Sequence, residues 1–259
     1  MNIVVCIKRV PDTAAEKKLD PNDKTLDRES VETILNPMDE YAVEAGLKLK
    51  ESIGGEVTVA CMGPEPAITT IRKALSMGAD KGLHLHDPAL HGSCSQNTAY
   101  AMAQALKTIP HDIVLCGAES TDARTSLVPA ALGEYLGYAA LTYASKLEVN
   151  GSTIRIQRDT DAGHDVIEAQ GPAVVSVIKG INEPRYPSFK GIMAAKSKPV
   201  TDLTLADIGV DASAVGAAGA RTAVVEFAER PPRTQGMLVK DEGDGGTKLA
   251  EFLQAQKFI

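Results

Sequence analysis

Asn2-Ile3-Val4-Val5-Cys6-Ile7-Lys8 begins the chain with five apolar residues in succession between polar neighbours. A short, continuous apolar run is typical of a strand that is buried on both faces of a parallel sheet. From Asp39 apolar residues recur at helical spacing, Gly54 and Gly55 end this helix, and a second apolar run occupies 57–61. The beginning of the chain therefore predicts a strand–helix–strand unit with two parallel strands.

The same alternation continues toward the C-terminus. Helical apolar spacing returns at 68–77, 96–106 and 127–136, and strand-like runs lie at 82–85 and 113–116. Alternating strands and helices with short connections predict an α/β fold, in which an open and mostly parallel sheet carries helices on both faces. This architecture is Rossmann-like and typical of domains that bind adenine nucleotides.

The pattern changes after Gly137. Asn150-Gly151 lies between the apolar runs 147–149 and 153–156, which is a strong signal for a β-hairpin. We therefore expect an added antiparallel hairpin in the region 141–178, which also contains a further strand at 172–178.

The last part of the chain has a different composition. From about Asp202 it is rich in Ala and Gly and poor in large apolar residues, which predicts an extended C-terminal arm that docks on another chain. The expected division is an α/β nucleotide-binding domain at 1–190, which includes the hairpin, and a partner-docking loop with the arm at 191–259.

Composition excludes several classes of protein. The 259 residues carry a formal net charge of −7 with Lys and Arg spread along the chain, which argues against a nucleic-acid-binding protein. No apolar run approaches the roughly 20 residues of a membrane-spanning helix, so we expect no membrane insertion. Since no secretory signal is recognisable, we expect a cytoplasmic protein or, as the second choice, one of the mitochondrial matrix. The four cysteines form no CxxC pair and no metal-binding spacing with histidine, so we expect no metal site.

Four segments are expected at one edge of the sheet, where the carboxyl ends of parallel strands meet. They are 6–9, 36–39, 61–64 and 117–126. The last is the most informative, because Gly117 ends a strand and Ser120 lies among hydroxyl-bearing residues near a helix start, where free backbone N–H groups can hold a phosphate. The alternative is that Thr121 or Asp122 serves only as a helix cap.

The sequence motifs of common enzyme classes are missing. The chain has no GxGxxG after its first strand, no GxxxxGK[ST], no GxSxG and no HExxH. No local spacing brings a nucleophile together with a base. We therefore expect a nucleotide-binding protein without catalytic residues of its own.

A second informative segment, 182–200, concentrates aromatic, apolar and basic residues in a chain with only 4% aromatics. An apolar anchor with a charged rim is typical of a protein contact site. The alternative is that its two aromatic rings fold back onto the core. The residues expected to form the contact site are Tyr186, Phe189, Ile192, Met193 and Lys196.

Several blocks of the chain together resemble the β subunits of electron transfer flavoproteins, from residue 2 to about residue 240. The blocks are CIKRVPD at 6–12, LNPMDEYAVE at 35–44, ALSMGAD at 74–80, NEPRY at 182–186 and IMAAK at 192–196. The resemblance implies a heterodimer with an α subunit, on which the arm would pack. Such a heterodimer takes electrons from flavin-dependent dehydrogenases, as in fatty acid β-oxidation, and passes them to a quinone oxidoreductase or similar acceptor.

The resemblance also implies cofactors and site residues. One redox FAD would lie mainly on the α subunit and be covered by this chain near Met38 and Thr13, and the chain itself would bind AMP in a structural role. Phe189 takes the position of the anchor that enters a pocket of the dehydrogenase. Together with Gly117 and Ser120, the AMP-contacting residues would be Cys6, Asn36, Pro37, Met38, Asp39, Met62, Asp122, Ala123, Arg124, Thr125, Ser126 and Val128.

Alternatives stay open at the nucleotide site. Asp122, Thr125 and Val128 match the electron-bifurcating form, which holds a second FAD in place of AMP, whereas Ala123, Leu127 and Pro129 do not. A different class, a stand-alone adenine-nucleotide-binding stress-type protein, would form a homodimer without flavin, and an NAD-dependent enzyme lacks its glycine motif. We predict AMP, because the loop offers little basic charge for more than one phosphate.

Overall fold

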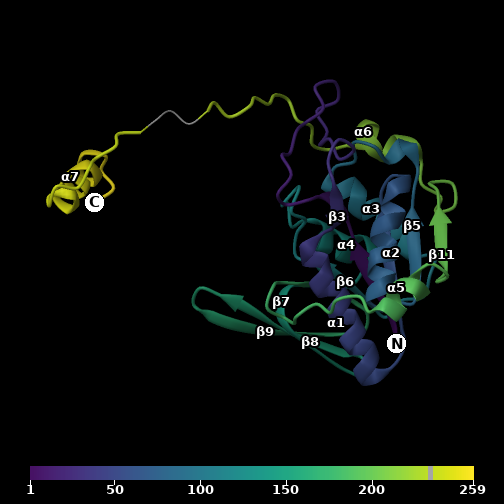
Figure 1. The fold of residues 1–259 in the computed structure, drawn as a ribbon. Helices are drawn as coiled ribbons and strands as arrows, with labels where there is room; N and C mark the ends of the chain where they lie inside the picture. Colours follow the sequence, from purple (N-terminus) through teal and green to yellow (C-terminus); the bar gives the residue numbers. More distant parts are fainter. Residues whose placement is uncertain (233–235) are drawn as a thin grey trace. The chain divides into compact units, whose positions relative to one another are not determined.

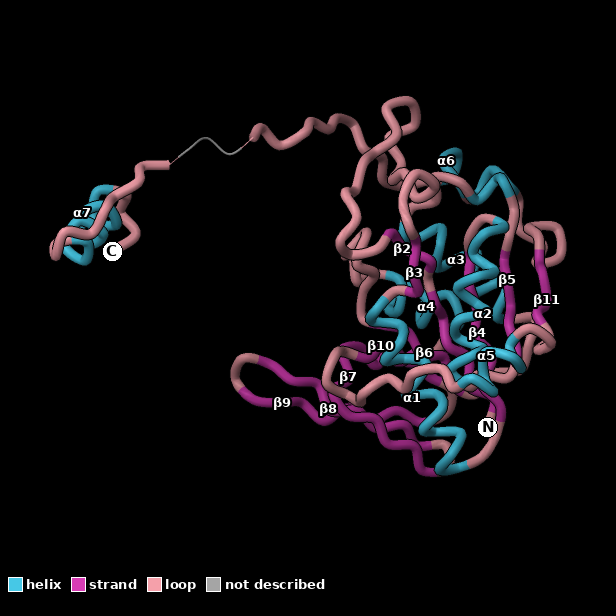
Figure 2. The backbone as a smooth tube through the Cα atoms, in the orientation of Figure 1, coloured by secondary structure: helices cyan, strands magenta, loops and turns pink. Residues whose placement is uncertain are grey.

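The computed structural model describes residues 1–232 and 236–259, which form two compact units, Met1–Val224 and Val225–Ile259. The first unit is built on a nine-stranded sheet with the order β11-β5-β4-β1-β6-β10-β7-β8-β9 (Figures 1 and 2). Its strands are β1 (Asn2–Ile7), β4 (Glu56–Met62), β5 (Lys81–Leu85), β6 (Ile113–Gly117), β7 (Ala139–Asn150), β8 (Thr153–Thr160), β9 (Gly163–Gln170), β10 (Ala173–Val177) and β11 (Val200–Leu203). A separate antiparallel ribbon pairs β2 (Arg9–Pro11) with β3 (Thr33–Leu35).

Helices cover both faces of the sheet, as predicted. The helices of this unit are α1 (Pro37–Ile53), α2 (Ile68–Met77), α3 (Ser95–Leu106), α4 (Val128–Leu136), α5 (Phe189–Ala195) and α6 (Gly216–Gly219), with short 3-10 turns η1 (Glu65–Ala67), η2 (Pro88–Leu90) and η3 (Ala212–Ala214). The strands from β11 through β7 in the sheet order are all parallel, and β7, β8 and β9 pair antiparallel. The predicted α/β fold is confirmed.

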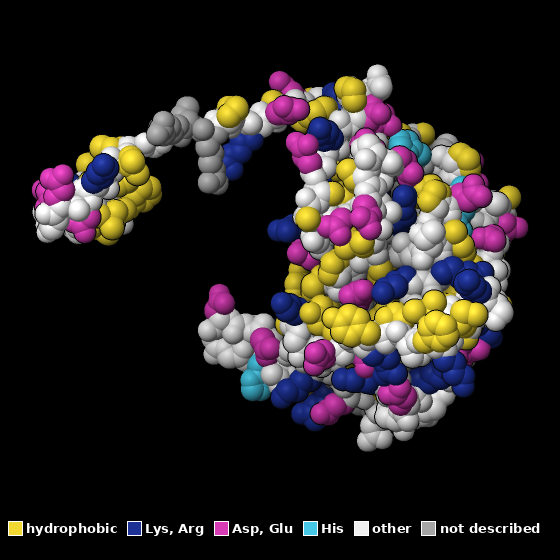
Figure 3. All heavy atoms as spheres, in the orientation of Figure 1, with side chains coloured by type: hydrophobic (Ala, Val, Ile, Leu, Met, Phe, Trp, Pro, Cys, Tyr) yellow, Lys and Arg dark blue, Asp and Glu magenta, His cyan; other side chains and the backbone are white. Residues whose placement is uncertain are grey.

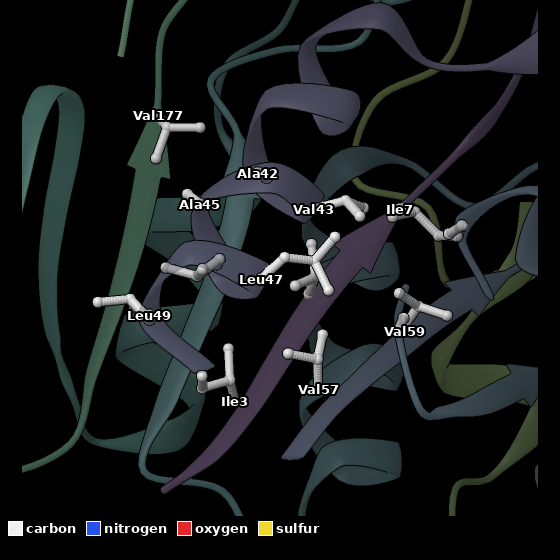
Figure 4. Close-up of a cluster of buried hydrophobic side chains, with 14 of the residues drawn as sticks. Ile3, Ile7, Ala42, Val43, Ala45, Leu47, Leu49, Val57, Val59 and Val177 are labelled. Carbon is white, nitrogen blue, oxygen red and sulfur yellow. The ribbon is translucent and has the colours of Figure 1, made fainter. Parts of the chain in front are cut away.

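Alternation along the buried strands creates two cores. Ile3 and Val5 of β1 pack with α1 and α2 on one face of the sheet, and Val4 packs with α3 and α4 on the other. Figure 4 shows the first core, where Val43 and Leu47 of α1 lie over β1 and β4. Residues 3–7 of the first strand alternate between the two cores, which explains the continuous apolar run.

The predicted hairpin is present and longer than expected. β7 and β8 pair through Asn150 and Thr153 around the turn at Gly151, which has a φ of 59°. A third antiparallel strand, β9, was not predicted, because its side chains are mostly exposed and give no clear apolar alternation. β7 changes partner along its length: it begins parallel to β10 and, past a bulge, continues antiparallel to β8.

The segment after residue 202 differs from the expected arm. β11 adds a parallel strand beside β5, and Leu205, Val210 and Val215 are buried in the second core. The first unit therefore extends to Val224, past the boundary expected at residue 190. Within the second unit, α7 (Gly245–Ala255) is a helix that the Gly-rich composition did not predict.

Candidate functional site

The candidate nucleotide site lies where the order of the sheet reverses. From β1 the chain passes through α1 to β4 on one side, and it later returns to place β6 on the other side of β1. The carboxyl ends of β1 and β6 therefore lie side by side while their connections leave in different directions. In open α/β sheets this position is where ligands bind.

Asp39 joins both strand ends to the first turn of α1. Its Oδ2 accepts the backbone N–H of Lys8 at 2.8 Å, and its Oδ1 accepts the backbone N–H of Gly117 at 3.2 Å. Burial raises the pKa of Asp39 to about 7, against the opposing effect of hydrogen bonds from Asn36, Lys8 and Gly117. A Cβ at Gly117 would overlap Asp39 and Met38, so this close approach requires glycine.

Asn36 connects α1 to the segment that follows β6. Its Nδ2 donates to the carbonyl of Glu119 at 3.0 Å, and its Oδ1 accepts the backbone N–H of Thr121 at 3.1 Å. The side chain is almost fully buried and makes no cap on its own helix. Asn36 thus fixes the loop 118–127, which we call the β6–α4 loop.

Asp122 of this loop forms an ion-pair network with two distant basic residues. Lys8 donates its Nζ to Asp122 Oδ1 at 2.8 Å, and Arg28 donates through Nε and Nη2 to Oδ2 at 3.1 and 2.6 Å. The Asp122 side chain is fully buried. Burial alone would raise its pKa, but the charges of Lys8 and Arg28 and hydrogen bonds from Lys8 and Ser120 hold it well below the usual range.

The helix-cap alternative for this segment is wrong. α4 begins at Val128, the residue before it is Leu127, and no side chain caps it. Asp122 is instead occupied by Lys8 and Arg28, and the buried Oγ1 of Thr121 has no hydrogen-bond partner among the described residues.

The remaining predicted nucleotide residues lie around this centre. Ala123, Arg124 and Thr125 are exposed, and Ser126 donates its hydroxyl to Glu119 at 3.2 Å. Arg124 and Ser126 have φ values of 48° and 53°, so the β6–α4 loop turns back on itself there. Residues elsewhere at the same edge are Cys6 and Pro37, which are partly exposed, and Met62 and Val128, which pack partly buried against the second core.

Three of the four predicted segments are thus joined directly by hydrogen bonds. The fourth adjoins them through the pairing of β4 with β1, in which Cys61 lies opposite Ile7. Burial raises the pKa of the Cys61 thiol to about 12. Sequence reasoning did not select Lys8 or Arg28 as site residues. Lys8 lies inside the segment 6–9, which the sequence places at this edge of the sheet. Arg28 carries no sequence signal, because it is 94 positions from its partner Asp122.

The predicted docking residues lie on and beside α5, at a separate place on the first unit. Tyr186 is 94% exposed and Phe189 is 82% exposed, so the alternative that they fold back onto the core of this unit is wrong. Ile192, Met193 and Lys196 are also exposed. We call these five residues the α5 surface; Figure 3 shows hydrophobic side chains over α5 with Lys and Arg side chains beside them.

The segment that leads into α5 is anchored on α1. Arg185 donates to the buried carboxylate of Glu44 at 2.7 and 3.0 Å and to Glu51 at 2.6 Å, and Asn182 donates to the carbonyl of Tyr41 at 3.0 Å. Hydrogen bonds from Arg185 to the two carboxylates raise its pKa. The exposed aromatic residues therefore project from a fixed base.

Two further searches cover residues 1–232 and 236–259 only. No group of three or more His, Cys, Asp or Glu side chains is arranged to hold a metal ion there. Within the same residues, every helix is too short or too polar to cross a membrane.

Comparison with known proteins agrees on one family. Residues 23–208 match the electron transfer flavoprotein domain. The electron transfer flavoprotein subunit beta of Mycobacterium tuberculosis (strain ATCC 25618 / H37Rv) is 50% identical over 264 residues, covering 100% of this chain and 99% of the relative. Proteins of the same name from Clostridium acetobutylicum and Megasphaera elsdenii are 39% and 37% identical, with full coverage of both chains. The chain therefore belongs to the electron transfer flavoprotein family and is similar over its whole length to that family's β subunits.

Proposed function

We propose that this chain pairs with an α subunit, binds AMP at the sheet edge, helps to cover an FAD held mainly by the α subunit, and docks flavin dehydrogenases through the α5 surface. The family accounts for its part in electron transfer, as an electron-transfer protein rather than a catalyst. The observation that carries the nucleotide part is the hydrogen-bonded junction of β1, β6, α1 and the β6–α4 loop at the reversal of strand order.

The residues at this edge fit a nucleotide. The β6–α4 loop bends back at two positions of positive φ and contains one buried hydroxyl without a protein partner, on Thr121. Loops of this kind hold phosphate with backbone N–H groups. Asn36 and Asp39 would fix the loop and the strand ends before the ligand arrives, so little ordering would be needed on binding.

Charge favours a single phosphate group. Lys8 and Arg28 are both paired with the buried carboxylate of Asp122, and the loop itself adds Arg124 and Glu119. Three cations against two carboxylates leave about one net positive charge, which suits a nucleoside monophosphate better than a dinucleotide pyrophosphate. This is our reason for preferring AMP to a second FAD.

The redox chemistry would belong to the flavin, which accepts and releases the electrons. This chain's own contribution would be to exclude water from one side of the flavin ring and to hold Met38 at the start of α1, beside the junction. Cytoplasmic localisation and a quinone oxidoreductase as acceptor stay predictions of the same proposal.

Docking would use the α5 surface. Large exposed apolar side chains on a fixed base lose little conformational freedom when they enter a partner's pocket, which is typical of binding hot spots. Phe189 is the central candidate because its large side chain is wholly apolar and 82% exposed, whereas the exposed ring of Tyr186 carries a hydroxyl.

Substitution of this residue tests the docking role. Phe189→Ala in the heterodimer should weaken the complex with a flavin dehydrogenase by about 2 kcal/mol or more. Its FAD content, its reduction by dithionite and its melting temperature should stay unchanged, because the side chain is exposed. A large fall in melting temperature with normal dehydrogenase-coupled rates would refute the docking role.

Co-expression tests the subunit arrangement. We expect the chain to co-purify with an α subunit as a yellow heterodimer. A colourless homodimer would instead support the stand-alone nucleotide-binding alternative.

A further inference from the structure

We propose that the depression between α2 and α5 is a second docking subsite, which accepts a carboxylate side chain of the same dehydrogenase that receives Phe189. This inference rests on the docking role proposed above. The depression has a volume of about 510 Å³, and the residues of its wall that matter here are Thr69, Arg72, Lys73, Ser76, Ile192 and Lys196.

The wall is rigid because the side chains of Arg72 and Lys198 hold α5 and the end of α2 together through backbone carbonyls. Arg72 donates its Nη1 to the carbonyls of Ala195 and Lys198 at 2.8 and 2.6 Å. Lys198 in turn donates its Nζ to the carbonyls of Leu75 and Ala79 at 3.0 and 2.6 Å, at the end of α2. The shape of the depression is thus set before a partner binds, which lowers the entropic cost of docking.

The depression is positively charged in a chain whose net charge is −7. Lys73 and Lys196 are exposed at its rim, Arg72 lies in its wall, and no Asp or Glu is among the described residues that line it. Glu40 of α1 interacts electrostatically with Lys73. Burial raises the pKa of Glu40, and the positive charge of Lys73 partly lowers it. The local excess of positive charge therefore selects an anionic group.

The location of the depression beside the α5 surface indicates that the anionic group it binds belongs to the docking partner. Ile192 and Lys196 belong both to the depression and to the α5 surface, so a protein seated on Phe189 would also cover the depression. Exposed charges alone bind a small free anion weakly, since water screens them. A partner that covers the site removes that screening and adds directional attraction to the approach. The continuous apolar and basic surface over this region is visible in Figure 3.

The experiment uses the purified heterodimer and a flavin dehydrogenase that reduces the wild type. The double variant Lys73→Gln, Lys196→Gln should lower kcat/KM for this reaction about tenfold at low salt, and the difference should shrink as salt is raised. Reduction by dithionite and FAD content should stay unchanged. Lys107→Gln serves as the matched control, because Lys107 is an exposed lysine at the end of α3, on the opposite face of the sheet.

Two further variants separate the outcomes. Lys73→Gln alone isolates the α2 wall, and the charge-preserving pair Lys73→Arg, Lys196→Arg must keep the wild-type salt dependence. If Phe189→Ala is impaired but the lysine variants are not, the subsite is refuted while the docking role stands. If neither is impaired, the proposed docking role itself fails. A loss of equal size at low and high salt, or one shared by the arginine pair, also refutes a charge-selective subsite.

Discussion

Asp39 holds the two central strand ends together with both oxygens of one buried carboxylate. In an Asp39→Asn variant, an amide NH₂ would face a backbone N–H of Lys8 or Gly117, so one buried donor would lose its acceptor. We expect a loss of about 1–3 kcal/mol in the free energy of unfolding. The melting temperature of the heterodimer at fixed protein concentration measures it, and a variant as stable as the wild type would argue against this arrangement.

The same residue gives stability a pH dependence with a defined sign. The pKa of Asp39 is raised from 3.8 to about 7, so between these values the folded chain binds the proton more tightly than the unfolded chain. Its contribution to stability therefore falls as pH rises from about 4 to about 7. We expect the melting-temperature gap between wild type and Asp39→Asn to narrow over this range. Other carboxyl groups titrate in both the wild type and the variant, so their effects cancel in the difference between the two melting temperatures. If this difference widened from about pH 4 to about pH 7, it would contradict the raised pKa of Asp39.

Asp122 is expected to be important for both stability and nucleotide retention. Asp122→Ala leaves Lys8 and Arg28 without their shared partner. Because both cations are about one-third exposed and stay partly solvated, we expect a loss of about 1–3 kcal/mol in the free energy of unfolding. The freed β6–α4 loop should also retain less AMP. Asp165→Ala on β9 is the control, because Asp165 is exposed. Equal melting temperatures and equal AMP content for the two variants would show that the network does not hold the loop.

The limits of sequence reasoning at this scale are visible in these residues. Asn36, Asp39 and Asp122 could be selected because they follow or precede predicted strands and helices, and strand ends converge at one edge. Arg28 could not, since a contact with a residue 94 positions away depends on the path of the whole intervening chain. The sequence also could not tell that Asp122 binds cations rather than capping α4.

At the scale of elements, α5 depends on a close backbone approach. A Cβ at Gly191 would overlap the carbonyl oxygen of Ser76 on α2. Gly191→Ala should therefore displace α5 and lower dehydrogenase-coupled reduction, while dithionite still reduces the FAD at the normal rate. Stopped-flow measurement with both donors checks this, and unchanged coupling would mean that the position of α5 does not matter for docking.

Burial explains which elements could be predicted. β1, β6 and β10 lie in the middle of the sheet and appear in the sequence as apolar runs. β9 and β11 lie at the two edges, where backbone hydrogen bonds rather than apolar side chains specify pairing, so the pattern of the sequence did not reveal them. For the same reason the sequence predicted an extended arm from about Asp202, although β11 pairs with β5 there.

For the whole molecule, the two compact units predict different resistance to proteases. Residues 200–224 contribute a strand and buried apolar residues to the first unit, whereas the second unit exposes Met237, Leu238, Leu249 and Phe252. In the isolated chain, trypsin should cleave early within the second unit, for example at Lys240, and leave residues up to about 224 intact. Co-expression with the α subunit should protect these sites. Equal resistance in both samples would contradict a role for the second unit in subunit contact.

The central claim is that this chain forms a heterodimer in which its own sheet edge holds AMP while the flavin lies mainly on the partner. Mass spectrometry of the nucleotides released on denaturing the purified heterodimer tests this most directly. The account predicts one FAD and one AMP per heterodimer, with less AMP but the same FAD content in Asp122→Ala. Two FAD and no AMP, or no flavin at all, would contradict it.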